Sequence, residues 1–309
     1  MSNQPHVPVL LQELMFWLRP NSRGCYVDCT LGPGGTAFRI LELSEPGGVL
    51  VGIDQDPEAI SLARRTLGPF LPRTHLFCRN FMDLKSILAS AGVGKADGIL
   101  FDLGISSVQL ASPTRGFSFL EEGSLDMRLG PFAGPTASDL VNTMPEAELA
   151  SLIRRYGEER YARRIAKAVV RERNHLPLRT TTQLTAIIRD SVPHSYRRGR
   201  LHCATRTFQA LRIAVNQELE VLEKTLHDAA DLLAPKGRLC VISFHSLEDR
   251  IVKHTFRALS QKPTPTLKIL TKKPCVPSME EREVNPRSRS AKLRVAERLC
   301  EGETGKEDT

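Results

Sequence analysis

The chain has 309 residues, of which 41% are hydrophobic and 25% are charged. These proportions are typical of a soluble globular protein, and the length fits one large α/β domain or two smaller ones. No apolar run approaches the roughly 20 residues of a membrane span, and the N-terminus shows neither a signal nor a transit pattern. We therefore expect a cytoplasmic protein with no membrane contact.

Seven cysteines are scattered along the chain, and no two of them form a C-x-x-C pair. This usage predicts neither a disulfide framework nor a zinc site, so we expect no bound metal.

The net charge of +8 is concentrated in one part of the chain. Residues 150–212 hold fifteen Lys and Arg against four Asp and Glu, which leaves the remainder mildly acidic. Such a segment fits a polyanionic partner or, equally well, a solvated Arg-rich helical surface.

The first third of the chain alternates strand-like and helix-like runs. Strands are expected at 25–30, 48–54, 74–80 and 96–104, with helices at 35–43, 56–67 and 81–91 between them. Asp56 is a natural N-cap for the second helix, and Pro57 fits its first position. This order predicts right-handed crossovers and a doubly wound parallel sheet of the α/β class.

The pattern changes after the fourth strand. Helices are expected at 136–144, 145–157, 159–174 and 181–192, followed by one long helix over 205–233. The α/β reading then resumes with a strand at 237–244, a helix at 246–259 and strands at 266–273 and 291–299. We predict one α/β domain, residues 1–108 and 206–309, that carries an inserted helical and basic domain, residues 109–205.

A glycine loop follows the first strand. Gly32-Pro33-Gly34-Gly35-Thr36-Ala37 satisfies the dinucleotide pattern G-x-G-x-x-G/A, which alone is a weak signal. Asp54 ends the second strand, where a carboxylate can accept hydrogen bonds from both ribose hydroxyls of an adenosine-containing cofactor. The loop lacks the G-K-[ST] ending of a nucleoside triphosphate site.

Two further positions distinguish the candidate cofactors. Asn80 and Phe81 follow the third strand and can bracket an adenine edge. Asp102 ends the fourth strand, where its carboxylate would suit a sulfonium cation. These features favour an S-adenosylmethionine-dependent methyltransferase, with a nicotinamide-dependent oxidoreductase as the alternative.

A second polar cluster, "VISFHSLEDR", ends the fifth strand. His245 is about as well explained by a structural hydrogen bond as by a catalytic role. Ser246 is predicted to cap the following helix, with Asp249 three residues later. Phe117 and Phe119 could stack on a base or anchor the inserted domain, and anchoring is slightly favoured.

Several long motifs resemble one family over nearly the whole chain and in order. They are "HVPVLLQEL", "TLGPGGTA", "GIDQDPEAI", "DGILFDLGISSVQL", "YGEERYARRIAKAVV", "ATRTFQALRIAVNQEL", "ISFHSLEDRIVK" and "NPRSRSAKLR". Together they resemble the ribosomal RNA small subunit methyltransferase H family. The resemblance implies S-adenosylmethionine-dependent methylation of a cytosine N4 amino group in 16S rRNA, near the ribosomal P site.

The resemblance also implies roles for single residues. By motif matching, the cofactor-binding residues are Gly34, Gly35, Thr36, Asp54, Phe81, Asp102 and Gln109. Thr36 stands where relatives usually have His, so its side-chain role is open, and Leu31 replaces the more usual Phe.

Other residues are predicted to act on the RNA substrate. We hypothesise that Asp102 accepts a hydrogen bond from the cytosine N4–H, with His245 as a second catalytic candidate. Seven residues of the basic segment are expected to hold rRNA phosphates: Arg154, Arg155, Arg160, Arg163, Arg164, Lys167 and Arg171.

The expected partner is 16S rRNA within the small ribosomal subunit. A noncatalytic RNA-binding assembly factor remains a further alternative. Free rRNA as substrate and a homodimer are both left open.

Overall fold

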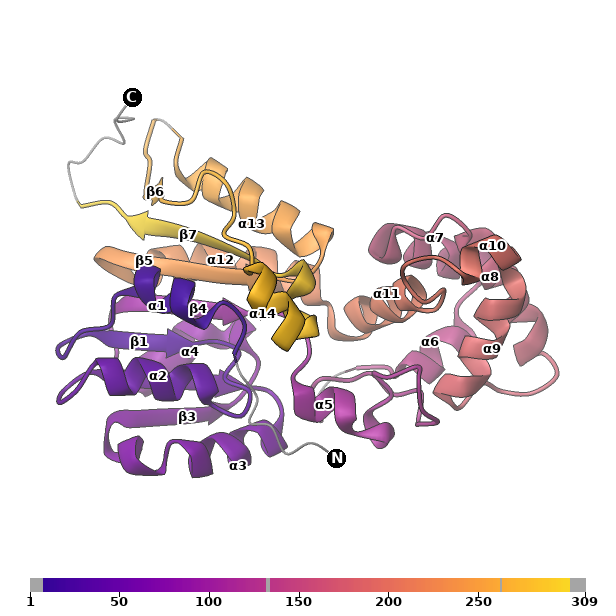
Figure 1. The fold of residues 1–309 in the computed structure, drawn as a ribbon, viewed down its shortest axis with the longest axis horizontal. Coiled ribbons are helices and arrows are strands. Elements are labelled where there is room, and N and C mark those ends of the chain that lie inside the picture. The colour runs from indigo at the N-terminus through magenta and orange to yellow at the C-terminus, as the bar shows by residue number, and fades with distance from the viewer. Residues whose placement is uncertain (1–7, 132–133, 262, 301–309) are drawn as a thin grey trace. The chain divides into compact units, whose positions relative to one another are not determined.

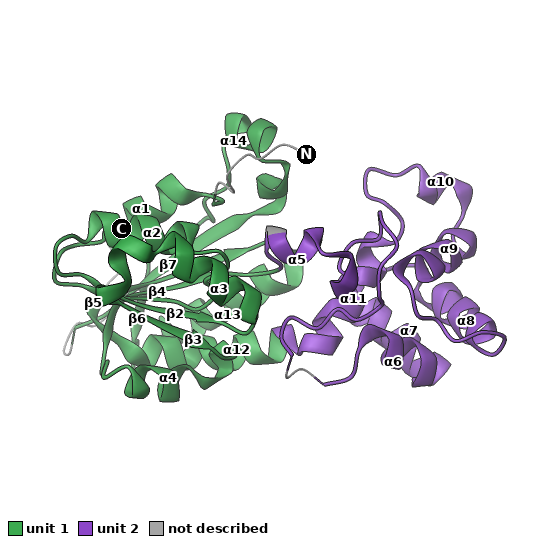
Figure 2. Ribbon diagram, turned by 90° about the horizontal axis from the view of Figure 1, so that it is seen from below, with its two compact units in different colours: residues 1–104, 219–309 green, residues 105–218 purple. Residues whose placement is uncertain are grey.

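The computed structural model describes residues 8–131, 134–261 and 263–300. The chain forms two compact units, which Figure 2 separates by colour. Unit 1 comprises residues 1–104 and 219–309, and unit 2 comprises residues 105–218. Unit 2 therefore extends beyond the predicted insert of residues 109–205.

Unit 1 is built on a seven-stranded sheet with the order β3-β2-β1-β4-β5-β7-β6. The first five strands in this order run parallel, and β7 is antiparallel to both β5 and β6. This arrangement confirms the predicted α/β doubly wound class. The strands are β1 (Cys25–Asp28), β2 (Val49–Asp54), β3 (Thr74–Cys78), β4 (Ala96–Asp102), β5 (Leu233–Ser243), β6 (Leu267–Ile269) and β7 (Lys292–Arg298).

Helices cover both faces of this sheet (Figure 1). One face packs against α1 (Leu11–Leu18), α2 (Gly35–Leu43) and α3 (Pro57–Thr66). The other packs against α4 (Leu84–Ser90), α12 (Glu218–Leu232) and α13 (Ser246–Leu259). The central strands are apolar on both sides because both faces are buried.

Several short elements complete unit 1. The 3₁₀ turns are η1 (Gly68–Arg73), η2 (Phe81–Asp83) and η4 (Pro286–Ser290), and a short helix, α14 (Met279–Val284), precedes η4. The sequence analysis assigned neither α1 nor α14. The two are joined where the backbone N–H of Leu10 donates to Oε1 of Glu281 at 2.9 Å.

Unit 2 is helical and has its own hydrophobic core. Phe117 is buried in it, and Phe119 packs on His202 and Phe208, so both phenylalanines anchor the unit. The helices are α5 (Ser107–Ala111), α6 (Ala137–Thr143), α7 (Glu146–Gly157), α8 (Ala162–Arg173), α9 (Thr181–Ser191), α10 (His194–Arg197) and α11 (Thr205–Asn216), with one 3₁₀ turn, η3 (Pro113–Arg115).

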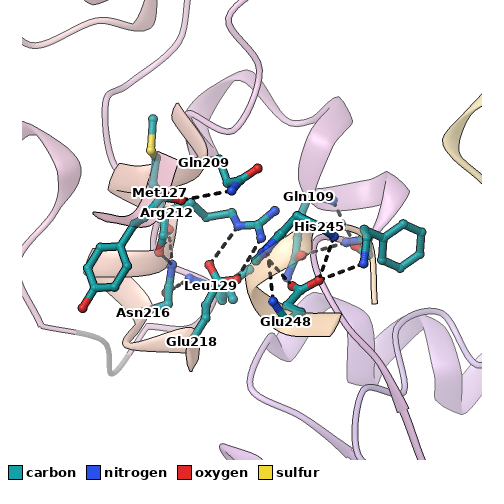
Figure 3. A network of polar contacts seen from close by, with 12 residues as sticks. Gln109, Met127, Leu129, Gln209, Arg212, Asn216, Glu218, His245 and Glu248 are labelled. Atoms are coloured by element: carbon teal, nitrogen blue, oxygen red, sulfur yellow. Dashed lines mark hydrogen bonds and ion pairs between the residues drawn. The ribbon is translucent and has the colours of Figure 1, made fainter. Parts of the chain in front are cut away.

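The prediction of one long helix over 205–233 is wrong. The helix is interrupted at Gln217, which has a left-handed φ of 51°. α11 and α12 are therefore separate helices. The side chain of Asn216 explains the break, because it accepts from the N–H of Leu129 and donates to the carbonyl of Met127. Figure 3 shows these bonds beside the two-bond ion pair of Arg212 with Glu218, at 2.8 Å for each bond.

Within the described part of the chain, no helix is both long enough and apolar enough to cross a membrane.

Candidate active site

The candidate site lies at the carboxyl edge of the unit 1 sheet. Parallel strands end at the same edge, and ligands of open α/β sheets bind there. β1, β2 and β4 end there in Asp28, Asp54 and Asp102. The sequence therefore delivers three carboxylates to one edge.

The loop between β1 and α2 is held against the second of these acids. The N–H of Gly32 donates to Oδ2 of Asp54 at 2.9 Å. Gly32 and Gly34 have φ values of 51° and 87°, which glycine adopts at little cost. A Cβ at Gly34 would also lie 3.3 Å from the Cα of Ala63 on α3.

This loop leads into the N-terminus of α2, where no side chain of the described residues caps the helix. The first N–H groups of a helix lack intrahelical acceptors, so this end can bind an anionic group such as a carboxylate. Gly35 and Thr36 are its first two residues, and Thr36 is buried.

Asp54 also orders the start of α3. Its Oδ1 accepts from the N–H of Asp56, and Asp56 in turn caps α3 by accepting from the N–H of Glu58. The predicted Asp56 cap, with Pro57 at the first helical position, is confirmed. A carboxylate has about four acceptor positions, and Asp54 uses at least two of them for the backbone N–H groups of Gly32 and Asp56.

The carboxyl group of Asp102 has a buried oxygen, Oδ1, without a hydrogen-bond partner among the described residues. Burial, the nearby Asp28 and then Glu248 raise its pKa to about 8. Because a buried polar atom without a partner costs free energy, this oxygen indicates a place for a donor or a cation.

Asp28 is the neighbour of Asp102 on β1. It is fully buried, and burial raises its pKa to about 7 although the N–H of Thr30 donates to its Oδ1. Perturbed pKa values of this kind gather at functional sites.

His245 occupies the end of β5 and caps α13. The prediction that Ser246 is the cap is wrong, because His245 Nδ1 accepts from the N–H of Glu248 at 3.4 Å. Glu248 completes the capping box, since its Oε2 accepts from the N–H groups of Phe244 and His245 (Figure 3). The second ring nitrogen, Nε2, lies 3.0 Å from Oε1 of Glu248. It is buried and, among the described residues, makes no hydrogen bond.

Phe81 and Asn80 lie after β3. Phe81 is partly buried and meets Phe101 edge to face, with ring centroids 5.4 Å apart. The side chain of Asn80 accepts from the N–H of Met82 and donates to Gln55, so it orders the turn. Of the two, Phe81 remains the candidate for contact with an adenine.

Gln109 belongs to unit 2. It is buried in α5, where its Oε1 accepts from the N–H of Ser106 and its own N–H donates to the Ser106 hydroxyl. These bonds form a capping box, and its cofactor-binding role stays a prediction.

All seven predicted phosphate-binding residues are exposed in unit 2. Arg163, Lys167 and Arg171 follow one face of α8, while Ile165, Ala166 and Val169 on the opposite face are buried. The seven residues lie on α7, on α8 and in the turn between them.

Three of these arginines lie over aromatic rings. The guanidinium of Arg155 lies 5.1 Å from the ring centre of Tyr156. The guanidinium of Arg160 lies 4.8 Å from the ring centre of Tyr161 and 4.7 Å from that of Tyr196. Arg164 also lies over Tyr161, at 5.7 Å. Such contacts stabilise a cation while its charge stays exposed.

The unit 1 edge fits S-adenosylmethionine on its own chemistry. The uncapped N-terminus of α2 suits the methionine carboxylate, Asp54 suits ribose hydroxyls, and the partnerless oxygen of Asp102 suits a neighbouring cation.

Comparison with known proteins decides the family. Residues 3–299 match the sequence profile of the MraW methylase family. The chain belongs to the MraW methylase family. As a member of this family it is a methyltransferase.

Relatives of this MraW-family methyltransferase are similar to it in sequence over nearly their full length. The protein is 48% identical to the ribosomal RNA small subunit methyltransferase H of Pelobacter propionicus, over 97% of this chain and 100% of that one. The protein of the same name from Halothermothrix orenii is 46% identical, over 95% and 98%. A solved rRNA methylase from Streptococcus thermophilus is only distantly similar, with 10% identity, a TM-score of 0.45 and coverage of 96% and 100%.

The sequence analysis missed two residues of the site. Thr30 forms hydrogen bonds with both Asp28 and Asp102, and Glu248 forms the reciprocal capping-box bonds with His245. Glu248 was detectable, because His245 and Glu248 have the three-residue spacing of a capping box.

Proposed function

We propose that the protein transfers the methyl group of S-adenosylmethionine to the N4 amino group of a cytidine in 16S rRNA of the small ribosomal subunit. The observation that carries this is the buried, partnerless carboxylate oxygen of Asp102, at the sheet edge of a chain of the MraW methylase family. The reaction would take place in the cytoplasm.

Residues of unit 1 would hold the methyl donor. Gly35 and Thr36 would bind its carboxylate through main-chain N–H groups. Gly34, whose own N–H donates to the carbonyl of Leu31, would let the carboxylate approach because it has no side chain. Asp54 would bind its ribose, and Phe81 would contact its adenine. S-adenosylmethionine supplies an electrophilic methyl group on a sulfonium. A cation near Asp102 would lower the pKa of this carboxyl and favour the charged form.

The cytosine amine is a poor nucleophile because its lone pair is delocalised into the ring. The enzyme must therefore hold N4 in line with the methyl group, and positioning of this kind can supply about 7–11 kcal/mol of a barrier. Asp102 would accept a hydrogen bond from N4–H. His245, whose Nδ1 accepts from the N–H of Glu248, would help to position the base or remove the proton afterwards.

The target base must leave its stack to reach the sheet edge. We propose that unit 2 is the substrate-recognition domain and that its exposed cations, Arg154, Arg155, Arg160, Arg163, Arg164, Lys167 and Arg171, bind rRNA phosphates. Gln109 would complete the cofactor-binding set.

Purified protein provides the test. It is incubated with methyl-labelled S-adenosylmethionine and with small ribosomal subunits from a strain that lacks the gene. We expect label in N4-methylcytidine, and we expect Asp102→Ala to remove it while the protein stays folded. Unlabelled rRNA with the wild-type protein, or normal labelling with Asp102→Ala, would contradict the proposal. Retained RNA binding without any labelling would favour the noncatalytic assembly factor.

A further inference from the structure

A second basic surface belongs to unit 1, whereas the predicted phosphate-binding residues belong to unit 2. It begins in the motif "NPRSRSAKLR", which the proposed function leaves without a role. Figure 1 shows α14, which immediately precedes the motif, beside the start of β7.

The register of the sheet places this motif at the active-site edge. Asp102 pairs with Ile242 on β5, and Ile242 pairs with Leu293 on β7. Neighbouring strands lie about 4.8 Å apart, so Leu293 lies about 10 Å from Asp102 along one row of the sheet. Because β7 is antiparallel, the residues that precede Leu293 continue toward and past the carboxyl edge.

The turn η4 presents its arginines to solvent. Ser288 is fully buried, its hydroxyl donates to the carbonyl of Asn285, and its carbonyl accepts from the N–H of Ala291. Arg287 and Arg289 flank this anchor and are exposed. Within the described residues, neither side chain forms a hydrogen bond or ion pair.

Lys292 adds a third cation at the same edge. Its Nζ lies 3.0 Å from Oδ2 of Asp249, which also binds the guanidinium of Arg294. Although burial acts in the opposite direction, these hydrogen bonds lower the pKa of Asp249, which stays ionised. One carboxylate between two cations leaves a net positive charge, and Lys292 keeps 40% of its side chain exposed.

Other charges lie on neighbouring segments. Lys272 and Lys273 are exposed just before Cys275, which pairs with Leu293. Glu280 and Glu283 on α14 are exposed, and their negative charges reduce the positive potential of these cations. Glu281 instead accepts from the N–H of Leu10. The segment 285–292 itself contains three cations and no acid.

We propose that Arg287, Arg289 and Lys292, the edge surface, bind phosphates of the RNA strand beside the base that enters the active-site edge. The inference rests on the proposed function. Arginine forks bind phosphate through two parallel hydrogen bonds, and an enzyme that unstacks a base must hold the backbone next to it. The edge surface lies at the carboxyl edge to which the unstacked base would be delivered.

Salt dependence of binding tests the edge surface. The double variant Arg287→Ala/Arg289→Ala is titrated with small ribosomal subunits from a strain that lacks the gene, at several salt concentrations. The matched control is Arg64→Ala/Arg65→Ala, which removes two exposed cations from the last turn of α3, toward the opposite edge of the sheet.

We expect the double variant to bind roughly tenfold more weakly and to lower the slope of log affinity against log salt by about 1 to 2. The control and the charge-preserving Arg287→Lys/Arg289→Lys should keep the wild-type slope. An unchanged slope, or an equal decrease in the control, would overturn the proposal.

Affinity for S-adenosylmethionine provides the check on folding. We expect all three variants to keep it, and its loss in the charge-preserving variant would overturn the proposal by showing that the turn is structural. Because the titration involves no methyl transfer, a protein that fails to methylate cytidine would refute the proposed function without changing these slopes.

Discussion

The backbone N–H of Asp102 donates to the hydroxyl of Thr30 over 2.6 Å. Thr30 also donates its own N–H to Oδ1 of Asp28 at 3.1 Å. One threonine thus links the ends of β1 and β4, by a bond to the carboxylate of Asp28 and a bond to the main chain of Asp102. Their pKa values, about 7 for Asp28 and about 8 for Asp102, give the site a measurable dependence on pH.

Asp102→Asn should change how stability depends on pH. Both acids have folded-state pKa values above the ordinary 3.8, so between about pH 4 and 8 the folded protein binds more protons than the unfolded chain. Stability of the cofactor-free protein should therefore fall as pH rises through this window, by up to about 1.4 kcal/mol per pH unit for each proton. Asn cannot ionise, so the variant should lose part of this slope and be more stable than wild type at pH 8. Urea unfolding at a series of pH values measures both curves, and identical slopes would contradict the raised pKa.

Thr36 and Gly34 should differ in their effect on cofactor binding. If main-chain N–H groups hold the methionine carboxylate, Thr36→Val should bind S-adenosylmethionine within about threefold of wild type. Gly34→Ala should bind at least tenfold more weakly, because its φ of 87° costs an L-residue about 1–2 kcal/mol and its Cβ would crowd Ala63. Equilibrium titration compares the two, and an equal loss would assign a direct contact to the Thr36 hydroxyl.

Two substitutions separate the structural and chemical roles of His245. His245→Ala removes the cap of α13 and should cost about 1 kcal/mol of stability. His245→Asn keeps a capping side chain, so its stability should stay near that of wild type. If the imidazole acts in the reaction, both variants should lower kcat. If His245→Asn kept the wild-type kcat, the role of His245 would be limited to capping α13.

Neutralising Arg163 and Arg164 tests the surface of α8. Both are exposed, and their replacement by Ala should weaken binding to small ribosomal subunits and reduce its salt dependence. Arg160→Ala should lower stability more than this pair does, because Arg160 lies over both Tyr161 and Tyr196, whereas Arg164 lies over Tyr161 alone and at a longer distance. If the Arg163/Arg164 variant kept the salt slope of the wild type, this face of α8 would not bind RNA and would be an ordinary solvated surface.

The fold was predictable where local signals agreed with the tertiary structure. Asp56 and Pro57 mark a helix start that needs no distant partner, and the apolar run of β4 reads as a buried parallel strand. The break at Gln217 was not predictable, because it depends on Asn216 bonding Met127 and Leu129 almost ninety residues earlier.

The candidate site was predictable in part for the same reason. Glycines and acids at strand ends identified the carboxyl edge, and Asp54 and Asp102 lie on it. The cap of α13 was misassigned because His245 and Ser246 both have an acid three residues later, and only the contacts of Glu248 distinguish them. The partnerless oxygen of Asp102 depends on tertiary burial, which no local pattern encodes.

The most direct test of the central claim is mass analysis of 16S rRNA nucleosides from a strain that lacks this gene, before and after the gene is restored. The proposed function predicts that N4 methylation of one cytidine is absent from the deletion strain and returns with the wild-type gene but not with Asp102→Ala. Unchanged cytidine methylation in the deletion strain would contradict it.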